Sequence, residues 1–326
     1  MPEQRPPKVT IGLPVYNGER FLARALDSHL AQTFQDFELI ISDNASTDGT
    51  RKICEDYAAR DPRIHYHCVD ENRGAMWNFN RCLELARGEY FKWSAHDDII
   101  EPTFLERCVE ALDADASLAL CHSRAKVVDE HMTVIGLYDP GALKTDSPSA
   151  STRFGARITG RTCIEIFGLM RTRMIRNNPR GPFQSFVGAD RAVLAELAVD
   201  GRFACVPEYL FLNGEHLGRS TSPKGPLDRL SFYTPVRKGA RSFPIWSLFG
   251  AYADIVHRRF TSFGDRCRCY GHMGRALFTR FNIVKMMLEP LSAFVPGVYQ
   301  AAAGAQRALG LDGYRNVRRS SPIRMK

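Results

Sequence analysis

Two adjacent aspartates follow a short aromatic and apolar run in the first third of the chain. Asp97 and Asp98 come after residues 90–94, YFKWS, which have the composition of a buried strand. Neighbouring carboxylates repel each other, and burial further disfavours their charged form. A divalent cation relieves both costs, because Mg²⁺ typically takes one or two protein carboxylates together with phosphate oxygens and water. Acidic residues before a helix can instead serve only the helix dipole, so the pair alone does not decide between these readings.

Two further polar clusters follow strand-like segments earlier in the chain. Tyr16 and Asn17 come after the β-branched run 9–15, and Asp43 comes after the run FELIIS at 37–42. Helical patterns separate these segments, so the connections are too long for hairpins and the sheet should be mostly parallel, with helices on both faces. Ligands of such sheets bind outside the carboxyl ends of the strands. The three clusters therefore predict one binding site at that edge.

The composition is that of a globular protein with an uneven distribution of charge. Of the 326 residues, 44% are hydrophobic and 25% are charged, and the net charge is +8. Residues 217–326 hold 19 of the 44 basic residues but only 5 of the 36 acidic ones. This basic tail predicts an anionic partner, either a membrane surface or a polyanion, although a solvated basic face explains it equally well.

Three features bear on where the protein works. No run approaches the roughly 20 apolar residues that span a bilayer, and residues 1–8 lack the apolar core of a signal peptide. The nine cysteines are scattered and odd in number, which argues against a disulfide framework. We therefore expect a cytoplasmic protein, peripheral on the inner face of the membrane if its basic tail binds lipid.

Four segments of the first 110 residues, taken together, resemble the family 2 glycosyltransferases. They are 9–21 (VTIGLPVYNGERF), 39–50 (LIISDNASTDGT), 72–80 (NRGAMWNFN) and 86–98 (ARGEYFKWSAHDD). Looser similarity at 188–191 and 206–208 extends the resemblance to about residues 8–216. It implies an α/β fold of the GT-A type, with a Rossmann-like, mostly parallel sheet flanked by helices. The implied division is a catalytic domain at 1–216 and a basic, mainly helical extension at 217–326.

The resemblance implies roles on the donor side of the site. Pro14, Val15 and Tyr16 would line the nucleotide base and ribose, and Glu19 would support their loop. Asp43 would accept a hydrogen bond from the base, which favours a UDP- or dTDP-sugar. The other implied donor contacts are Asn72, Gly74, Asp97 and His216, the last at the diphosphate beside Arg219.

The resemblance also implies a metal site and a base. Asp98, with Asp97, would hold Mn²⁺ or Mg²⁺, and Asp190 would deprotonate the acceptor hydroxyl in a single inverting displacement. The sequence departs from the family pattern at Ala95, where an acidic residue is usual. His96, between Ala95 and the aspartates, is read as a tolerant position more readily than as a diphosphate donor.

We therefore expect an inverting, metal-dependent glycosyltransferase of the hexosyltransferase type. Its acceptor would be a glycan or a lipid-linked hydroxyl in cell-envelope polysaccharide or glycolipid synthesis, with no nucleic-acid partner. A nucleotidyltransferase acting on a sugar phosphate would need a Gly-rich, lysine-bearing loop after the first strand, and a dinucleotide oxidoreductase would need G-x-G-x-x-G there. LPVYNGERF supplies neither. A non-catalytic nucleotide-sugar-binding protein of the same fold would not need Asp97, Asp98 and Asp190 together.

Two later segments bear on the acceptor and on partners. Residues 138–157 are rich in Gly, Pro, Ser, Thr and Asp, and they predict a long loop that contributes to acceptor specificity. Residues 278–299 are apolar with interspersed Arg and Lys and are broken by two prolines. This segment fits a helix on a membrane surface, packing against the catalytic domain, or a homo-oligomer contact.

Overall fold

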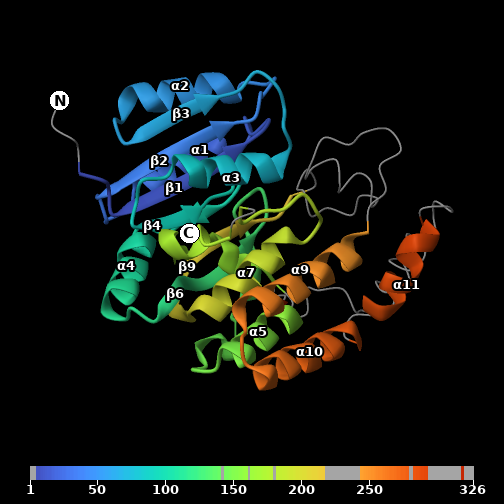
Figure 1. Ribbon diagram of the computed structural model, residues 1–326. Coiled ribbons are helices and arrows are strands. Elements are labelled where there is room, and N and C mark those ends of the chain that lie inside the picture. Colours follow the sequence, from blue (N-terminus) through green and yellow to red (C-terminus); the bar gives the residue numbers. More distant parts are fainter. Residues whose placement is uncertain are drawn as a thin grey trace.

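A twisted sheet runs through the molecule, and helices cover both of its faces (Figure 1). The computed structural model describes residues 5–140, 143–160, 162–178, 181–216, 243–278, 282–292 and 317–318. The strands are β1 (Val9–Val15), β2 (Phe37–Asp43), β3 (Ile64–Cys68), β4 (Tyr90–Trp93), β5 (Ile99–Ile100), β6 (Leu118–Val128), β7 (Val134–Tyr138), β8 (Leu169–Arg171), β9 (Arg202–Gly214) and β10 (Val317–Arg318).

The helices alternate with the strands in the first third of the chain and dominate its last described part. They are α1 (Leu22–Leu30), α2 (Thr50–Arg60), α3 (Ala75–Leu85), α4 (Phe104–Ala114), α5 (Ala150–Thr159), α6 (Thr172–Ile175), α7 (Ala189–Asp200), α9 (Pro244–Arg259), α10 (Phe263–Phe278) and α11 (Asn282–Ser292). Two short 3₁₀ helices cover Lys144–Asp146 and Ile164–Phe167.

The half of the sheet that the sequence predicted most directly is parallel. β3, β2, β1 and β4 lie side by side in that order, and Val9 of β1 lies opposite Phe37 of β2 and Tyr90 of β4. Beyond β4 the sheet is mixed, because β8 runs antiparallel to both β4 and β6, whereas β9 runs parallel to β6. The carboxyl ends of β1, β2 and β4 consequently share one edge, as the sequence analysis expected.

The strands β1, β2 and β4 of the parallel half are buried on both faces, which explains why they are mostly apolar. Side chains of β1 such as Ile11 and Leu13 face a core shared with α1, α2 and α4. On the other face Phe91 and Trp93 of β4 pack against α3 and α7. A third core joins α5, α7, α9 and α10, so the C-terminal helices pack on the rest of the molecule through α5 and α7 (Figure 1).

The prediction of a long loop over residues 138–157 is wrong at both ends of that segment. β7 includes Tyr138, and α5 begins at Ala150. Its polar residues mark a helix start, because the Ser149 hydroxyl accepts a hydrogen bond from the Thr152 amide at 3.3 Å. The buried arginines of α5 find partners elsewhere in the chain, as Arg153 does at the carbonyl of Ala198.

The basic tail is described only in part. Residues 217–242, which include Arg219, and most residues after 292 lie outside the described part of the chain. Between them α9, α10 and α11 bear out the expected helical character of the extension. None of the described helices is long and apolar enough to cross a membrane.

Candidate functional site

The end of β4 meets the end of β9 through a carboxylate and an imidazole. Asp97 lies in the turn that follows β4, and its Oδ2 is 2.9 Å from Nε2 of His216, two residues beyond the end of β9. Both side chains are largely buried, with exposed fractions of 8% for Asp97 and 10% for His216. The His216 ring also packs against Phe21, with 4.5 Å between ring centroids. Residues 119 positions apart are thus brought into direct contact.

The neighbouring carboxylate of Asp98 turns to different partners. Its Oδ1 accepts hydrogen bonds from Nδ2 of Asn213 and from the backbone N–H of Gly214, both at 3.0 Å. Asp98 is buried, and these bonds tie the turn after β4 to the last residues of β9. The two aspartates that the sequence presents as a pair therefore differ in surroundings: Asp97 faces an imidazole, and Asp98 faces amide groups.

A buried lysine lies beneath this turn. Nζ of Lys92, in β4, donates to the backbone carbonyls of Trp93 at 3.0 Å and Phe167 at 2.7 Å, and its side chain has no exposed surface. Burial lowers the pKa of Lys92 to about 8, and the negative charge of Asp98 partly opposes that change. The ammonium group therefore compensates part of the carboxylate charge gathered at the end of β4.

The loop after β1 is fastened to the loop after β2. Asn17 has a positive φ of 53°, its backbone N–H donates to the Ser46 hydroxyl at 2.9 Å, and its Oδ1 accepts from the Thr47 amide at 2.8 Å. The Glu19 carboxylate accepts from the Gly49 amide at 3.0 Å. Directly before these anchors the Tyr16 side chain is 44% exposed, so its ring is available to a ligand.

Asp43 holds the second loop in shape from within. Its Oδ1 accepts from the Ser46 amide at 2.9 Å, its Oδ2 accepts from the Tyr66 hydroxyl at 2.8 Å, and its side chain has no exposed surface. The hydrogen bonds tie Asp43, the last residue of β2, to β3 and to the loop that follows β2. They also show that its carboxylate organises the loop that follows β2.

A third loop is held by an amide side chain that sequence reasoning did not single out. Asn44 donates to Oδ1 of Asn72 at 2.9 Å and accepts from the Arg73 amide at 3.0 Å. Gly74 has a φ of 86°, a conformation that favours glycine, and its N–H donates to the same Asn72 oxygen at 2.8 Å. Asn78 extends the tie to β1, because its Nδ2 donates to the Val15 carbonyl at 3.3 Å.

The expected base lies on a different element. Asp190 is in the first turn of α7 and is half-buried. Its neighbour Ala189 packs in the same buried cluster as Trp93 of β4. On its other side Arg191 donates to the Gly160 carbonyl at 2.8 Å, which fixes the start of α7 against the end of α5. Asp190 thus lies on α7, outside the hydrogen-bonded loops that follow β1, β2 and β3.

The residues at the end of β4 fit a divalent cation with few protein ligands. Two ligand atoms that bind one ion at about 2.1 Å and at a right angle lie about 3 Å apart, close to the Asp97–His216 separation. A carboxylate oxygen suits Mg²⁺ or Mn²⁺, and an imidazole nitrogen is a ligand of divalent transition metals. The described residues contain no cluster of three or more His, Cys, Asp or Glu that could hold a metal. An ion here would therefore need phosphate and water to complete its shell.

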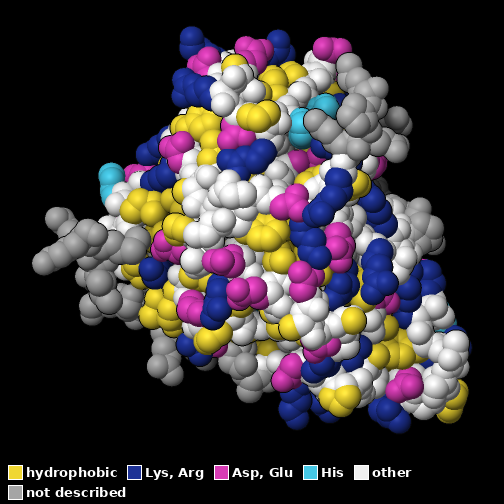
Figure 2. All heavy atoms as spheres, turned by 90° about the vertical axis from the view of Figure 1, so that its left-hand side faces the viewer, with side chains coloured by type: hydrophobic (Ala, Val, Ile, Leu, Met, Phe, Trp, Pro, Cys, Tyr) yellow, Lys and Arg dark blue, Asp and Glu magenta, His cyan; other side chains and the backbone are white. Residues whose placement is uncertain are grey.

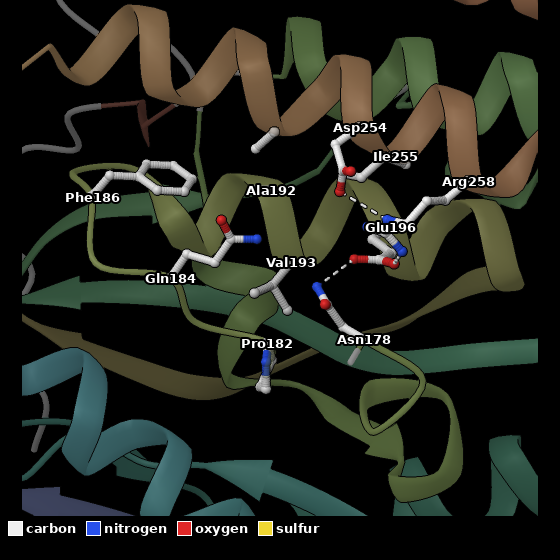
Figure 3. Close-up of a pocket in the computed structure, with 11 residues that line it drawn as sticks. Asn178, Pro182, Gln184, Phe186, Ala192, Val193, Glu196, Asp254, Ile255 and Arg258 are labelled. Carbon is white, nitrogen blue, oxygen red and sulfur yellow. Dashed lines mark hydrogen bonds and ion pairs between the residues drawn. The ribbon is translucent and has the colours of Figure 1, made fainter. Parts of the chain in front are cut away.

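A separate hollow lies between α7, α9 and the loop before α7 (Figure 3). Figure 3 shows Glu196 pointing toward Asn178 and Arg258 across it, and these groups are already hydrogen-bonded to one another. None of the residues predicted for the site lines this hollow. The candidate site is therefore the strand edge and not the hollow.

Sequence reasoning missed three residues that shape this edge: Asn44, Lys92 and Asn213. The lysine inside the apolar run YFKWS could have indicated such a residue, because a charged group in a buried strand needs hydrogen-bond or ionic partners. The two asparagines gave no such signal. Their partners lie 28 and 115 residues away in the chain.

Comparison with known proteins agrees with this geometry. Residues 10–171, which include Asp97 and Asp98, match the family model described as glycosyl transferase family 2. Chondroitin synthase of Escherichia coli is 33% identical over 132 residues, which are 40% of this chain and 19% of that protein. Among the curated relatives, this chain spans between 14% and 45% of their length.

Two solved structures share the fold. Staphylococcus aureus TarS 1–349 in complex with UDP has a TM-score of 0.59 and 18% identity, over 94% of this chain and 89% of that one. The mannosyltransferase PcManGT from Pyrobaculum calidifontis, in complex with GDP-Man and Mn²⁺, has a TM-score of 0.51 and 17% identity, over 91% and 88%. At these identities the likeness shows that the architecture is shared.

Proposed function

The chain belongs to glycosyl transferase family 2, and on that premise we propose that it transfers a sugar from a nucleoside-diphosphate sugar to a hydroxyl group of a glycan or lipid-linked acceptor, with inversion. The observation that carries the proposal is the contact of Asp97 with His216 at the edge where the loops after β1 and β2 also meet. A polysaccharide product is consistent with the similarity to chondroitin synthase.

The nucleoside would lie against the loops after β1, β2 and β3. Tyr16 offers an exposed ring for stacking, and Pro14 and Val15, the last residues of β1, would line the base and ribose beside it. Asp43 and the Asn72–Gly74 turn would set the shape of the base pocket through the bonds described above. Because these loops are hydrogen-bonded in advance, little ordering would be required when the donor binds. TarS was solved with UDP, which supports a uridine donor here.

The diphosphate would face Asp97 and His216. A Mn²⁺ or Mg²⁺ ion held by these residues would supply neutralisation of the charge that develops on the leaving nucleoside diphosphate. His216 holds the Asp97 carboxylate in place, and Lys92 beneath the turn offsets the negative charge of Asp98. Asp98 itself, through Asn213 and Gly214, would keep β9 and therefore His216 in register with the turn.

Asp190 would accept the proton of the acceptor hydroxyl. Inversion needs a base on the face of the sugar opposite to the leaving group, and α7 presents Asp190 from an element outside the donor loops. Phe183, in the segment before α7, packs edge to face against Trp93 of β4 with 4.9 Å between the ring centroids, and Ala189 belongs to the same buried cluster. This shared cluster links the element that carries the proposed base to the strand that precedes the proposed diphosphate site.

Release of nucleoside diphosphate from a panel of UDP-, dTDP- and GDP-sugars, measured with Mn²⁺ and with a chelator, tests the proposal. We expect metal-dependent release from at least one donor, and a loss of about a hundred- to a thousandfold in Asp97→Asn. The exposed Asp56→Asn of α2 is a matched control and should keep full activity. Release that is unaffected by Asp97→Asn would contradict the assignment of this edge.

The same assay separates the two aspartates. If Asp97 is the main ligand, Asp97→Asn should raise the Mn²⁺ concentration needed for half-maximal release more than Asp98→Asn does. Asp98→Asn should chiefly lower the melting temperature, because its bonds to β9 are structural. The opposite pattern would indicate that Asp98 is the main metal ligand, as the sequence analysis expected.

A further inference from the structure

Exposed hydrophobic side chains are concentrated in the C-terminal helices. Seven large hydrophobic side chains are exposed in the described part of the chain, and six of them lie in α9, α10 and α11. They are Trp246, Phe263, Tyr270, Phe278, Val284 and Met287, and the seventh is Tyr16 of the donor loop. Single exposed hydrophobic residues are ordinary, but a group on neighbouring helices indicates a contact surface.

Helix α10 carries half of this group on one face. Phe263, Cys267, Tyr270 and Phe278 are all exposed, and they follow one another at intervals of four, three and eight residues. At 3.6 residues per turn these intervals place them on one stripe of the helix. Phe263 is 83% exposed and Phe278 is 76% exposed, at the two ends of a helix about 24 Å long. The stripe therefore runs along the whole helix.

The opposite face of α10 is firmly packed. Cys269, Met273 and Ala276 are buried in the core that α10 shares with α5 and α9. A Cβ at Gly155 of α5 would come within 2.5 Å of the His272 ring, so the two helices approach closely at that point. Figure 1 shows α10 at the outer edge of the molecule, with α5 and α9 between it and the sheet. The stripe thus faces outward because the other side of the helix is held in place.

Basic side chains border the stripe. Arg268 and Arg275 are exposed on one side of it, about two helical turns apart along the axis and therefore at nearly the same angle around it. The one acidic residue of α10, Asp265, is paired with Arg268 at 2.9 Å. Figure 2 shows the face of the molecule that lies to the left in Figure 1, and there Lys and Arg side chains are interspersed with Asp and Glu side chains. The whole of 217–326 is basic, with 19 Lys and Arg against 5 Asp and Glu.

We propose that α10 is an interfacial helix that lays its outward stripe on an anionic lipid surface. The aromatic rings would enter the boundary between headgroups and acyl chains, and the arginines would contact lipid phosphates. A second copy of the chain suits this face less well. A symmetric contact through the stripe would bring the arginines of both copies together, and the one acidic residue of α10, Asp265, is already paired with Arg268 of its own copy.

Sedimentation of the full chain with vesicles tests this inference independently of any transferase activity. The probes are neutral phosphatidylcholine vesicles and vesicles with added phosphatidylglycerol. We expect binding to the anionic vesicles that weakens with salt, and little binding to the neutral ones. Phe263→Ser with Phe278→Ser should weaken binding at least tenfold, because two exposed rings are lost. Arg268→Gln with Arg275→Gln should weaken it roughly 25-fold, at about fivefold for each arginine.

A matched control removes the same charge elsewhere. Lys52→Gln with Arg60→Gln changes two exposed residues of α2, at the opposite end of the molecule in Figure 1, and should alter binding less than twofold. Because all six side chains are exposed, melting temperatures should stay close to that of the unchanged protein. Equal binding to neutral vesicles, no binding to anionic ones, or equal losses in the α2 control would overturn the inference. A loss of self-association without a loss of lipid binding in the Phe variant would overturn it as well.

Discussion

The donor edge and the C-terminal helical layer are held together in different ways. At the donor edge, loops separated by up to 119 residues are joined by side-chain hydrogen bonds such as those of Asn17, Asn44 and Asp97. In the helical layer α5, α7, α9 and α10 share an apolar core. Ion pairs, such as that of Glu196 with Arg258, join neighbouring helices beside it. The first arrangement fixes polar groups in advance for a ligand. The second buries apolar surface and holds α10 in place, so that its exposed stripe faces outward.

This difference separates the consequences of substitution. Hydrogen-bonded loops at a ligand edge cost little reorganisation when they bind, so their loss should appear in donor affinity. Packed helices contribute mainly to folding, so their loss should appear in stability. Asp190 lies on α7, which belongs to the helical layer, but we propose that it acts in catalysis. Substitution of Asp190 is therefore the strongest test of where the boundary between the two regions lies.

Asp190→Asn should give the largest effect of the substitutions that probe the boundary. Loss of a positioned base typically costs about a hundred- to ten-thousandfold in rate, and the half-buried side chain makes no bond on which α7 depends. We expect kcat to fall in that range while calorimetry shows unchanged binding of the donor. Wild-type turnover in this variant would exclude Asp190 as the base, and weakened donor binding would place α7 in the donor site.

Glu196→Gln should act on the helical layer alone. The Glu196 carboxylate accepts from Arg258 at 2.7 Å, from Arg259 at 3.1 Å and from Asn178 at 2.9 Å, and it joins α7 to α9 (Figure 3). Loss of its charge should lower the free energy of unfolding by about 1–3 kcal/mol. Chemical denaturation measures this, and donor affinity should not change.

A surface pair provides the control for Glu196. Glu110, on α4, pairs with Arg107 at 3.2 Å, and both side chains are about half exposed. Glu110→Gln should change the free energy of unfolding by less than about 0.5 kcal/mol, because solvent screens exposed pairs. If the two variants were equally stable, the junction of α7 and α9 would be a surface contact only, and the proposed contrast between the two regions would be lost.

The parallel half of the fold could be predicted because its signals are local. Each of β1, β2 and β4 is buried on both faces, so each appears as a short apolar run that ends at a polar cluster. The rule that ligands bind at carboxyl ends then brings Tyr16, Asp43 and Asp97 to one edge. The structure does place them at that edge, and the roles given to them remain proposals.

The segment 138–157 shows where such reading fails. Its polar composition suggested a loop, yet Arg157 of α5 is buried and is bound to Glu165 at 2.6 Å, with the Tyr138 hydroxyl on the same oxygen at 2.7 Å. From the sequence alone, the charged residues of a buried ion pair cannot be distinguished from charged residues on the surface. The contact of Asp97 with His216 was hidden for the same reason, since nothing local in the sequence records a partner 119 residues away.

Asn44→Ala should have a smaller effect than Asp190→Asn or Glu196→Gln. It tests whether the loops of the donor edge must be held by their hydrogen bonds before the donor binds. The substitution removes the side chain that holds the Asn72–Gly74 turn to the end of β2, through bonds at 2.9 and 3.0 Å. We expect a loss of about 1 kcal/mol in donor binding, or roughly a fivefold rise in donor KM, with kcat little changed. Asn177→Ala, at an exposed asparagine before the hollow, is the matched control and should leave both constants unchanged. A fall in melting temperature without a rise in donor KM would mean that this turn stabilises the fold and does not contact the donor.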